Sequence, residues 1–410
     1  MVNETSGKRD EVGPAIEELE RLGVEVRRFE RPSNEKEAQR VVEAAARENW
    51  TLLPVGGATV PGASLPAEVD LVLDTTGLDR ILALDPQNLT VAVLGGMTID
   101  AINNHLAREG RGFFLPADPP CSDRATVGGT FAANASGPLR HLYGTLRDLV
   151  LGVRGVDARG REMGFGGKTV KNVSGYDITK FLLGSAGSFG VITSLSLRIY
   201  PIPSASSLCE VSFADGDGGL GAFVSDLRSS VLVPSAVLVA EAEEGRIRCL
   251  VALEGHPGAV ERQQKDLQSM ASHHGGAFRV QEGRSAMLET LRTPLDPLPL
   301  GEDRISLKVC VPPAAGVAVF EALRRVVPSP RRVALLAGNG VVWVTMGEEG
   351  GVMSGVRELA ARHEGHVVPV RVHRSVLEAW ESCHSPEYRR FVLEPLKKSL
   401  DPARLFPAVE

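Results

Sequence analysis

The sequence predicts an α+β protein of two domains. Three glycine-rich elements lie in its first half, at Pro54–Thr59, Ala125–Gly129 and Gly167–Thr193. A pair of prolines, Pro201 and Pro203, closes a strand-like run and marks a domain boundary. Beyond it, strand-like runs alternate with amphipathic helical stretches, a pattern that indicates an α+β domain whose main sheet is antiparallel.

The bulk composition is that of a soluble globular protein with a small excess of acid. Of its 410 residues, 43% are hydrophobic and 23% are charged, and this length gives room for two domains with a core each. With 45 basic against 51 acidic residues the net charge is −6, which disfavours wholesale binding to nucleic acid. Any anionic ligand must therefore be held by local geometry.

The cysteines and the first residues point to a cytoplasmic protein without a metal site of its own. The five cysteines are far apart and form no C-x-x-C pair, so we expect no iron–sulfur cluster, structural zinc or disulfide framework. The first dozen residues lack an apolar core, and no apolar run reaches about 18 residues. We expect neither a secretory signal nor a membrane-spanning helix.

The N-terminal elements follow from local patterns. Residues 1–10 are expected to form a flexible tail, followed by a helix over Ile16–Leu22 and an extended run over Val24–Phe29. Asn34 is placed to cap a second helix, with Glu37 at the capping-box position. Later in this half, Thr98 is expected to cap a helix that runs to Leu106, and Phe113–Leu115 leads into Pro116–Pro120. Strands are expected at Leu52–Val55, Asp70–Asp74, Leu89–Leu94 and Val191–Tyr200.

The second half is expected to alternate strands and helices. Strands are predicted at Cys209–Phe213, Val237–Ala240, Ile247–Leu253, Ile305–Val311 and Val341–Met346, and helices at 258–272, 315–326 and 353–363. An amphipathic helix over Pro386–Leu400 ends at Asp401 and Pro402.

The first two glycine elements have the chemistry of an anion site. The loop Gly56–Thr59 follows a strand at once, so its successive N–H groups and the Thr59 hydroxyl can surround an anion. A plain β-turn is the alternative. Thr126–Gly129 precedes a run of small residues able to open a helix whose unpaired N–H groups face a phosphate. There the alternative is a core helix that simply opens on glycine.

Two further glycine motifs are weaker. The stretch Glu162–Thr169 resembles a phosphate-binding P-loop but has Glu162 where the motif requires glycine, which would oppose a phosphate. Gly216–Gly221 matches G-x-G-x-x-G, yet Asp215 and Asp217 put negative charge where a pyrophosphate would lie. A polar loop in the second domain is the better interpretation of that stretch.

In their order and spacing, these elements resemble the FAD-binding oxidoreductases of the vanillyl-alcohol oxidase/PCMH superfamily, and more closely the smaller FAD-binding subunit of bacterial glycolate oxidase. The matching pieces are Pro54–Thr59, Pro116–Pro120, Ala125–Gly137, Tyr143–Gly144, Arg147–Asp148, Gly167–Asp177 and Gly184–Thr193. The resemblance implies a two-subdomain PCMH-type FAD-binding domain over 11–203 and an α+β cap domain with a mainly antiparallel sheet over 204–375. Residues 376–410 would return to the FAD-binding domain.

The resemblance also implies a cofactor, FAD, and the residues that hold it. Its binding residues would be Pro54, Val55, Gly56, Gly57, Ala58, Thr59, Pro116, Asp118, Pro119, Thr126, Val127, Gly128, Gly129, Ala133, Asn134, Ser136, Gly137, Gly190, Val191 and Ile192. The pyrophosphate would lie on the first two glycine elements, and the isoalloxazine ring beside Asn134, Ser136 and Gly137. The chain departs from the family at Ala58, Ala186 and Ala408. The first loop has no histidine, and Cys121 is misplaced for a cysteinyl link, so we expect non-covalent FAD.

Catalysis on a 2-hydroxy acid needs a base for the hydroxyl proton and a cation for the carboxylate. The candidates are His141, beside the cofactor elements, and His366, His373, Arg371 and Arg374 late in the cap. Each of them has a solvated or packed side chain as its alternative. Lys168 and Lys171 are better placed to stabilise the reduced flavin or its phosphates than to act as base.

Three functional hypotheses remain open on the sequence. The chain can be the FAD subunit of a glycolate or D-lactate oxidase or dehydrogenase, an accessory FAD subunit that relays electrons or acts as a scaffold, or a stand-alone oxidase of sugars or lactones. The paired-histidine motif of the larger catalytic relatives is absent, and His363–His366 is the nearest match. The resemblance implies a paralogous FAD-binding subunit and an iron–sulfur subunit as partners. Membrane association would come only through such partners.

Overall fold

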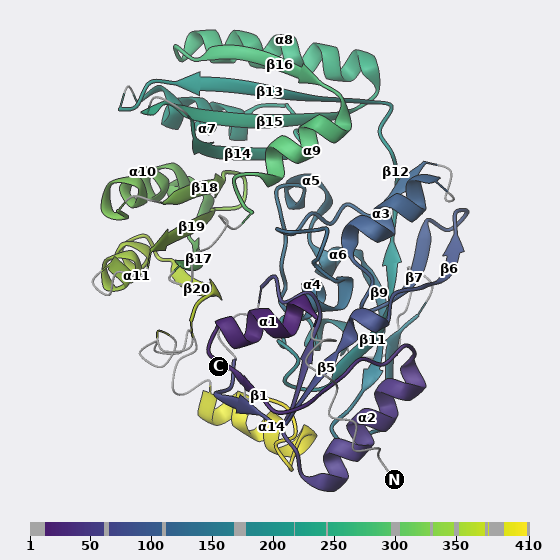
Figure 1. Ribbon diagram of the computed structural model, residues 1–410. Coiled ribbons are helices and arrows are strands. Elements are labelled where there is room, and N and C mark those ends of the chain that lie inside the picture. Colours follow the sequence, from purple (N-terminus) through teal and green to yellow (C-terminus); the bar gives the residue numbers. More distant parts are fainter. Residues whose placement is uncertain are drawn as a thin grey trace. The chain divides into compact units, whose positions relative to one another are not determined.

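A computed structural model of the chain describes residues 13–60, 65–108, 112–167, 178–216, 218–242, 245–296, 304–328, 331–347, 352–373, 376 and 389–407. Its contacts divide these residues into two compact units (Figure 1). Unit 1 takes its described residues from Met1–Ala135, Thr145–Pro201 and Arg371–Glu410, and unit 2 from Ser136–Gly144 and Ile202–Val370. Residues 136–144, predicted to belong to the first domain, cluster with unit 2 instead. The expected tail, 1–10, lies outside the described residues.

The N-terminal part of unit 1 is a small parallel sheet with its own core. Its strands run in the order β2-β5-β3, and β1 pairs with β4. Valine and leucine side chains of this sheet pack on helices α1 and α2. The bounds are α1 Pro14–Arg21, β1 Glu25–Val26, β2 Phe29–Glu30, α2 Glu35–Glu48, β3 Leu52–Val55, β4 Glu68–Val69 and β5 Leu71–Asp74.

The cap of α2 confirms half of the predicted capping box. The Asn34 side chain accepts a hydrogen bond from the Glu37 N–H at 3.0 Å, as expected. The return bond is different, because the Glu37 carboxylate accepts from the N–H and the hydroxyl of Ser33 and not from the backbone N–H of Asn34. These bonds lower the pKa of Glu37, with the Ser33 N–H as the largest cause.

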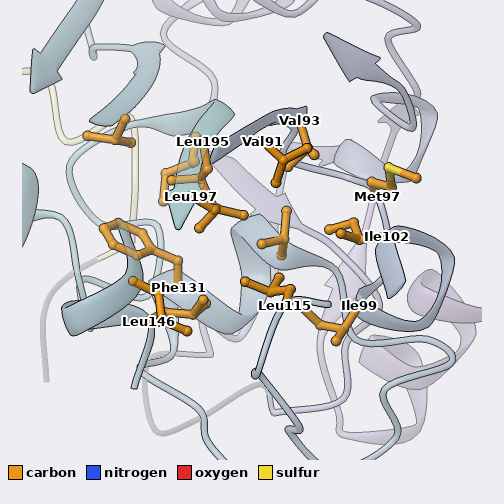
Figure 2. Close-up of a cluster of buried hydrophobic side chains, with 14 of the residues drawn as sticks. Val91, Val93, Met97, Ile99, Ile102, Leu115, Phe131, Leu146, Leu195 and Leu197 are labelled. Carbon is orange, nitrogen blue, oxygen red and sulfur yellow. The ribbon is translucent and has the colours of Figure 1, made fainter. Parts of the chain in front are cut away.

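The second layer of unit 1 is an antiparallel sheet in the order β10-β9-β11-β7-β6. Figure 2 shows its core, in which side chains from β7 and β11 meet those of α3 and α4. Phe131, Ile99 and Ile102 are fully buried there. The bounds are β6 Ile81–Asp85, β7 Thr90–Leu94, α3 Ile99–Arg108, β8 Phe113–Phe114, α4 Val127–Ala132, α6 Leu146–Leu149, β9 Val150–Val156, β10 Glu162–Gly166, β11 Val191–Arg198 and β12 Tyr200–Pro201.

The C-terminal segment clusters with unit 1. The predicted helix over 386–400 is described from residue 389, where a π-helical turn, Arg389–Leu393, leads into α14, Glu394–Leu400. Lys397 of α14 is buried and its Nζ lies 2.6 Å from the carbonyl oxygen of Ser188. Within the described part of the chain, no helix is long and apolar enough to cross a membrane.

Unit 2 is built on one large sheet, ordered β16-β13-β15-β14-β18-β19-β17-β20. From β16 through to β17 its neighbouring strands pair antiparallel, which confirms the predicted α+β class with a mainly antiparallel sheet. Helix α8 packs on β13 and β15, α10 on β18 and β19, and α11 on β17. The bounds are α5 Arg140–Tyr143, β13 Ala205–Phe213, α7 Gly219–Ser229, β14 Ala236–Glu241, β15 Ile247–Gly255, α8 Pro257–His273, β16 Ala277–Glu282, α9 Arg284–Arg292, β17 Arg304–Cys310, α10 Gly316–Val326, β18 Arg332–Leu336, β19 Val341–Gly347, α11 Val352–Arg362 and β20 His366–Arg371.

The weak glycine motifs are structural. Glu162–Gly166 is β10, an edge strand paired with β9, and not a phosphate-binding loop. Gly218 takes φ +75 and opens α7, while Asp215 just before it accepts a hydrogen bond from Arg324 of α10 at 2.9 Å. Residues 168–169 and Asp217 lie outside the described residues.

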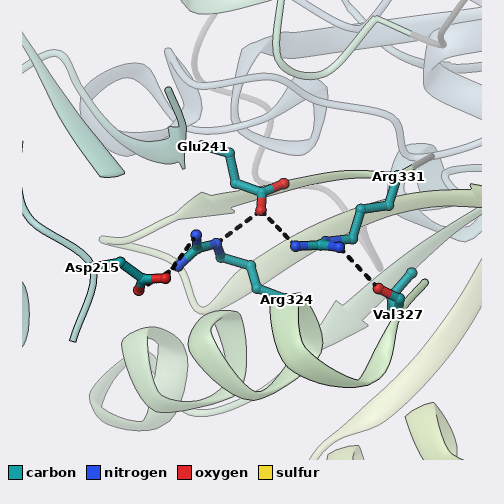
Figure 3. Close-up of polar contacts among 5 residues, drawn as sticks. All are labelled: Asp215, Glu241, Arg324, Val327 and Arg331. Atoms are coloured by element: carbon teal, nitrogen blue, oxygen red, sulfur yellow. Dashed lines mark hydrogen bonds and ion pairs between the residues drawn. The ribbon is translucent and has the colours of Figure 1, made fainter. Parts of the chain in front are cut away.

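Arg324 is the centre of a charged network between α10 and the sheet (Figure 3). Its Nε donates to the Glu241 carboxylate at 2.9 Å, and Arg331 donates to the same oxygen at 3.0 Å. The Arg324 side chain is only 8% exposed, whereas that of Asp215 is 54% exposed. The interior contact to Glu241 therefore carries most of the stabilisation.

We expect Glu241→Ala to lower the free energy of unfolding by about 2–3 kcal/mol, because it leaves the mostly buried Arg324 charge without its inner partner. Asp215→Ala removes only the exposed partner and should cost within about 1 kcal/mol. Urea unfolding of both variants checks this. Equal losses would show that burial does not set the strength of this network.

Candidate functional site

The first two glycine elements meet in unit 1. The loop Gly56–Thr59 leaves the end of β3 and lies against the segment that leads into α4. A Cβ placed on Gly56 would overlap the Thr126 hydroxyl, and one placed on Gly57 would overlap the carbonyl oxygen of Arg124. Glycine is required at both positions because backbone approaches the neighbouring segment too closely for a side chain.

The third element joins them from the loop before β11. The N–H of Ala186 donates to the carbonyl oxygen of Ala132 at 2.9 Å, and that of Gly184 donates to Phe131 at 3.2 Å. A Cβ on Gly187 would lie 3.2 Å from the ring of Pro54. The structure thus brings together, within one unit, three glycine-rich elements that are far apart in the sequence.

The loop Gly56–Thr59 carries backbone N–H groups that are available to bind a ligand. In the described part of the chain, none of its four backbone N–H groups has an acceptor. The loop is half-buried, and Ala58 takes the left-handed conformation with φ 49. Successive backbone N–H groups in a turn of this kind can bind an anion. A pyrophosphate fits such a site, because it offers acceptor oxygens and negative charge without needing a cationic side chain.

The prediction of unpaired N–H groups at Thr126–Gly129 is wrong. The N–H of Val127 donates to Met97 at 2.9 Å, that of Gly128 to Gly95 at 2.8 Å, and that of Gly129 to the Thr126 hydroxyl at 3.1 Å. The start of α4 therefore has its donors satisfied inside the protein. The segment that opens α4 packs directly against the Gly56–Thr59 loop.

The other predicted cofactor residues lie at several places. Pro54 and Val55 end β3. Pro116, Asp118 and Pro119 are buried in a segment fixed by Asn103, whose side chain bonds both the N–H and the carbonyl of Leu115. Val191 and Ile192 are buried in β11, where their backbone pairs with β9, and a Cβ placed on Gly190 before them would lie 2.5 Å from the Val156 carbonyl oxygen.

The segment expected beside the isoalloxazine ring crosses from one unit to the other. Ala133 is half-buried, and Asn134 is exposed with φ 47, a left-handed residue close to Gly184. Both belong to unit 1, whereas Ser136 and Gly137 belong to unit 2. The Ser136 hydroxyl accepts a hydrogen bond from Arg140 at 3.1 Å.

Of the candidate bases, His141 has the most suitable electrostatics. It lies on α5 in unit 2, and its ring packs so closely on Gly338 that a Cβ there would overlap it. Burial lowers the pKa of His141. The imidazole is therefore neutral near pH 7 and able to accept a proton. His373 is half-buried after β20, and His366 is exposed.

Arg371 does not meet the expectation of a carboxylate clamp. Its Nε pairs with the largely buried carboxylate of Glu18 on α1, so its charge is already compensated within unit 1. Arg374, Lys168 and Lys171 lie outside the described residues. Sequence reasoning missed Lys308, a cation flanked by Leu307 and Val309 in strand β17. Among the described residues, no group of His, Cys, Asp and Glu is arranged to hold a metal ion.

Comparison with known proteins identifies the type of domain that contains the Gly56–Thr59 loop. Residues 27–166 match the family model for an FAD binding domain. The chain is 34% identical over 209 residues to glycolate oxidase subunit GlcD of Bacillus subtilis. The aligned stretch covers 50% of this chain and 43% of that protein. It is 31% identical over 208 residues to D-lactate dehydrogenase of Archaeoglobus fulgidus (50% and 46%), and 39% identical over 127 residues to glycolate oxidase subunit GlcE of Escherichia coli (31% and 36%). The chain thus matches less than half the length of each of these relatives.

Solved structures agree on the fold. Xylooligosaccharide oxidase from Myceliophthora thermophila has a TM-score of 0.72 at 15% identity, covering 97% of this chain and 99% of that one. p-Cresol methylhydroxylase has a TM-score of 0.72 at 14% identity, covering 92% and 87%. Residues 27–166 are therefore an FAD-binding domain with FAD as its cofactor, and the chain shares its fold with these two solved proteins.

Proposed function

We propose that this chain is an FAD-dependent oxidoreductase subunit that acts on the CH–OH group of a small 2-hydroxy acid such as glycolate or D-lactate. The observation that carries the proposal is the similarity of half of this chain to a glycolate oxidase subunit and to a D-lactate dehydrogenase. The loop of free N–H groups at Gly56–Thr59 supports it, since a phosphate-bearing cofactor needs such a loop.

FAD would be held without a covalent bond, by the Gly56–Thr59 loop and the elements that pack on it. When bound, the flavin accepts a hydride from the carbon that carries the hydroxyl. His141 would take the hydroxyl proton, since its neutral imidazole is a proton acceptor. Asn134 is exposed in unit 1, and the chain continues from it directly into the segment that carries His141.

Anaerobic reduction of the flavin tests this function. The full chain, loaded with FAD, is mixed with glycolate or D-lactate, and the flavin absorbance is followed. We expect bleaching by at least one acid, and slower bleaching in His141→Gln. The lowered pKa keeps the imidazole of His141 neutral over a wider pH range. The rate of bleaching should therefore stay constant as the pH falls past about 6.5, the usual pKa of histidine, and should decrease only in more acidic solution. Bound FAD that neither acid reduces would contradict the proposal.

An accessory subunit that relays electrons is the second candidate. The GlcE similarity favours it, because that protein is named as one subunit of glycolate oxidase. The buried cysteines are poor cluster ligands, since burial raises the pKa of Cys209 and of Cys249 to about 12. In this case a paralogous FAD-binding subunit and an iron–sulfur subunit would be the partners. FAD that is reduced only when these partners are present would distinguish the relay from a self-sufficient enzyme.

A stand-alone oxidase of sugars or lactones is the third candidate, and it rests on the fold shared with carbohydrate oxidases. Bleaching by xylobiose but not by glycolate or D-lactate would favour it.

A further inference from the structure

One face of the unit 2 sheet carries a lysine, Lys308, with no matching acid near it among the described residues. Along β17, Ile305, Leu307 and Val309 alternate with Ser306, Lys308 and Cys310, so the two sets point to opposite faces. Arg324 of α10 bonds Glu241, and the strand register places Val309 on the same face as Glu241. Lys308 therefore lies on the face away from α10.

Lys308 has an aromatic neighbour but no acidic one. It pairs across the strands with Trp343, and its Nζ lies 5.6 Å from the centre of that ring. No described residue forms an ion pair with it. By the same alternation Glu254 shares this face, but it stands four strands away, about 19 Å, and already accepts hydrogen bonds from Tyr143 and Arg284.

A second cation lies near Lys308. Burial is the largest effect and lowers the pKa of Lys308, Cys310 raises it, and the nearby Arg140 guanidinium lowers it. Cys310, next on the same face, supplies no counter-charge, because burial raises the pKa of its thiol. A mostly buried cation is unfavourable unless an anion joins it.

Trp343 gives an independent sign of a missing acceptor. This residue is 6% exposed, yet its indole N–H has no hydrogen-bond partner among the described residues. A buried donor left unpaired costs free energy, so it implies an acceptor that arrives with a ligand. This donor belongs to the ring that the Lys308 ammonium approaches.

We propose that Lys308, Trp343 and Arg140 form the binding site for the carboxylate of the substrate, an inference that rests on the proposed oxidation of a 2-hydroxy acid. A carboxylate offers two acceptor oxygens and one negative charge, which match an ammonium, an indole N–H and a guanidinium. His141 follows Arg140 directly on α5, so one short helix supplies both a carboxylate contact and the candidate base.

Oxalate, which carries carboxylates but no CH–OH group, is the probe for this site. Calorimetric titration of the FAD-loaded full chain should show oxalate binding, weakened at least about 10-fold in Lys308→Met and less in Trp343→Phe, which keeps an aromatic ring but loses the N–H. Lys265→Met removes an exposed lysine of α8 and serves as the charge-matched control with unchanged affinity. No oxalate binding to the unaltered protein, or equal binding to Lys308→Met, would overturn the site, as would tighter binding of inorganic phosphate than of oxalate.

Thermal unfolding gives a second readout that does not depend on activity. Without an anion, Lys308→Met should be at least as stable as the unaltered protein, because it removes an uncompensated buried charge, and oxalate should no longer raise its Tm. A large loss of stability in Lys308→Met would contradict the site. If oxalate binding depends on Lys308 but neither glycolate nor D-lactate bleaches the flavin, the anion site stands and the proposed oxidation fails. If glycolate or D-lactate bleaches the flavin equally well in Lys308→Met and in the unaltered protein, the proposed oxidation stands and the anion site fails.

Discussion

Gly57→Ala is expected to abolish retention of FAD. The added Cβ would overlap the carbonyl oxygen of Arg124, a backbone atom that cannot rotate away, so the Gly56–Thr59 loop must move off the segment that supports it. Because the free N–H donors of the site lie on this loop, their common direction is lost with it. We expect FAD affinity to fall about 100-fold or more, equivalent to roughly 2.7 kcal/mol of binding free energy. The measurement is fluorescence titration of the apoprotein with FAD.

The matched control for this variant is Gly164→Ala in β10. There the nearest atom to the new Cβ is 3.9 Å away, an ordinary contact, and the strand lies in the same unit. The control should bind FAD normally. If Gly57→Ala folds with the same circular dichroism and still binds FAD with full affinity, the loop does not hold the cofactor.

Asp401→Ala is expected to cause a large loss of stability in unit 1. The Asp401 side chain is fully buried, accepts from the N–H groups of Leu405 and Phe406, and pairs with Lys397 at 2.8 Å. Lys397 in turn lies within hydrogen-bond distance of the carbonyl oxygens of Ser188, Phe406 and Pro407. Removing the carboxylate leaves a buried ammonium without its counter-charge, so we expect a loss of about 3–5 kcal/mol in urea unfolding.

The same network reaches the proposed cofactor site through Ser188, which lies in the third glycine element. Lys397→Met should cost less stability than Asp401→Ala, because Asp401 keeps its two backbone donors. It should nevertheless weaken FAD binding, since the Ser188 carbonyl loses its anchor. Arg404→Ala removes an exposed pair with Glu394 and should change neither property. Asp401→Ala with the stability of Arg404→Ala would contradict this account of the C-terminal segment.

Local patterns were enough to predict much of unit 1. The cap at Asn34, the strand Leu52–Val55 and its direct entry into a glycine loop depend on residues close in the chain, so the sequence contains their cause. The resemblance then gave the cofactor, which the match to an FAD binding domain confirms. The edge strand β16 was missed because it is short and exposed, and only Phe278 and Val280 in it alternate with polar residues.

The failures concern contacts made across long sequence distances. The donors of α4 are satisfied by Gly95 and Met97, residues some thirty positions earlier that only the folded sheet brings near. The sequence left Arg371 as a candidate carboxylate clamp, whereas in the structure it pairs with Glu18, more than three hundred residues away. Lys308 and Trp343 become neighbours through the register of β17 and β19, which the sequence does not specify. A lysine between Leu307 and Val309 in a predicted strand was the available signal.

Hydrogen–deuterium exchange with and without FAD tests most directly which backbone amides bind the cofactor. The N–H groups of Gly56, Gly57, Ala58 and Thr59 have no acceptor in the described protein, so they should exchange fast in the apoprotein and become strongly protected once FAD binds. Those of Val127, Gly128 and Gly129 should be slow in both states. Fast exchange of the Gly56–Thr59 amides at full FAD occupancy, with new protection appearing only at Val127–Gly129, would contradict the account.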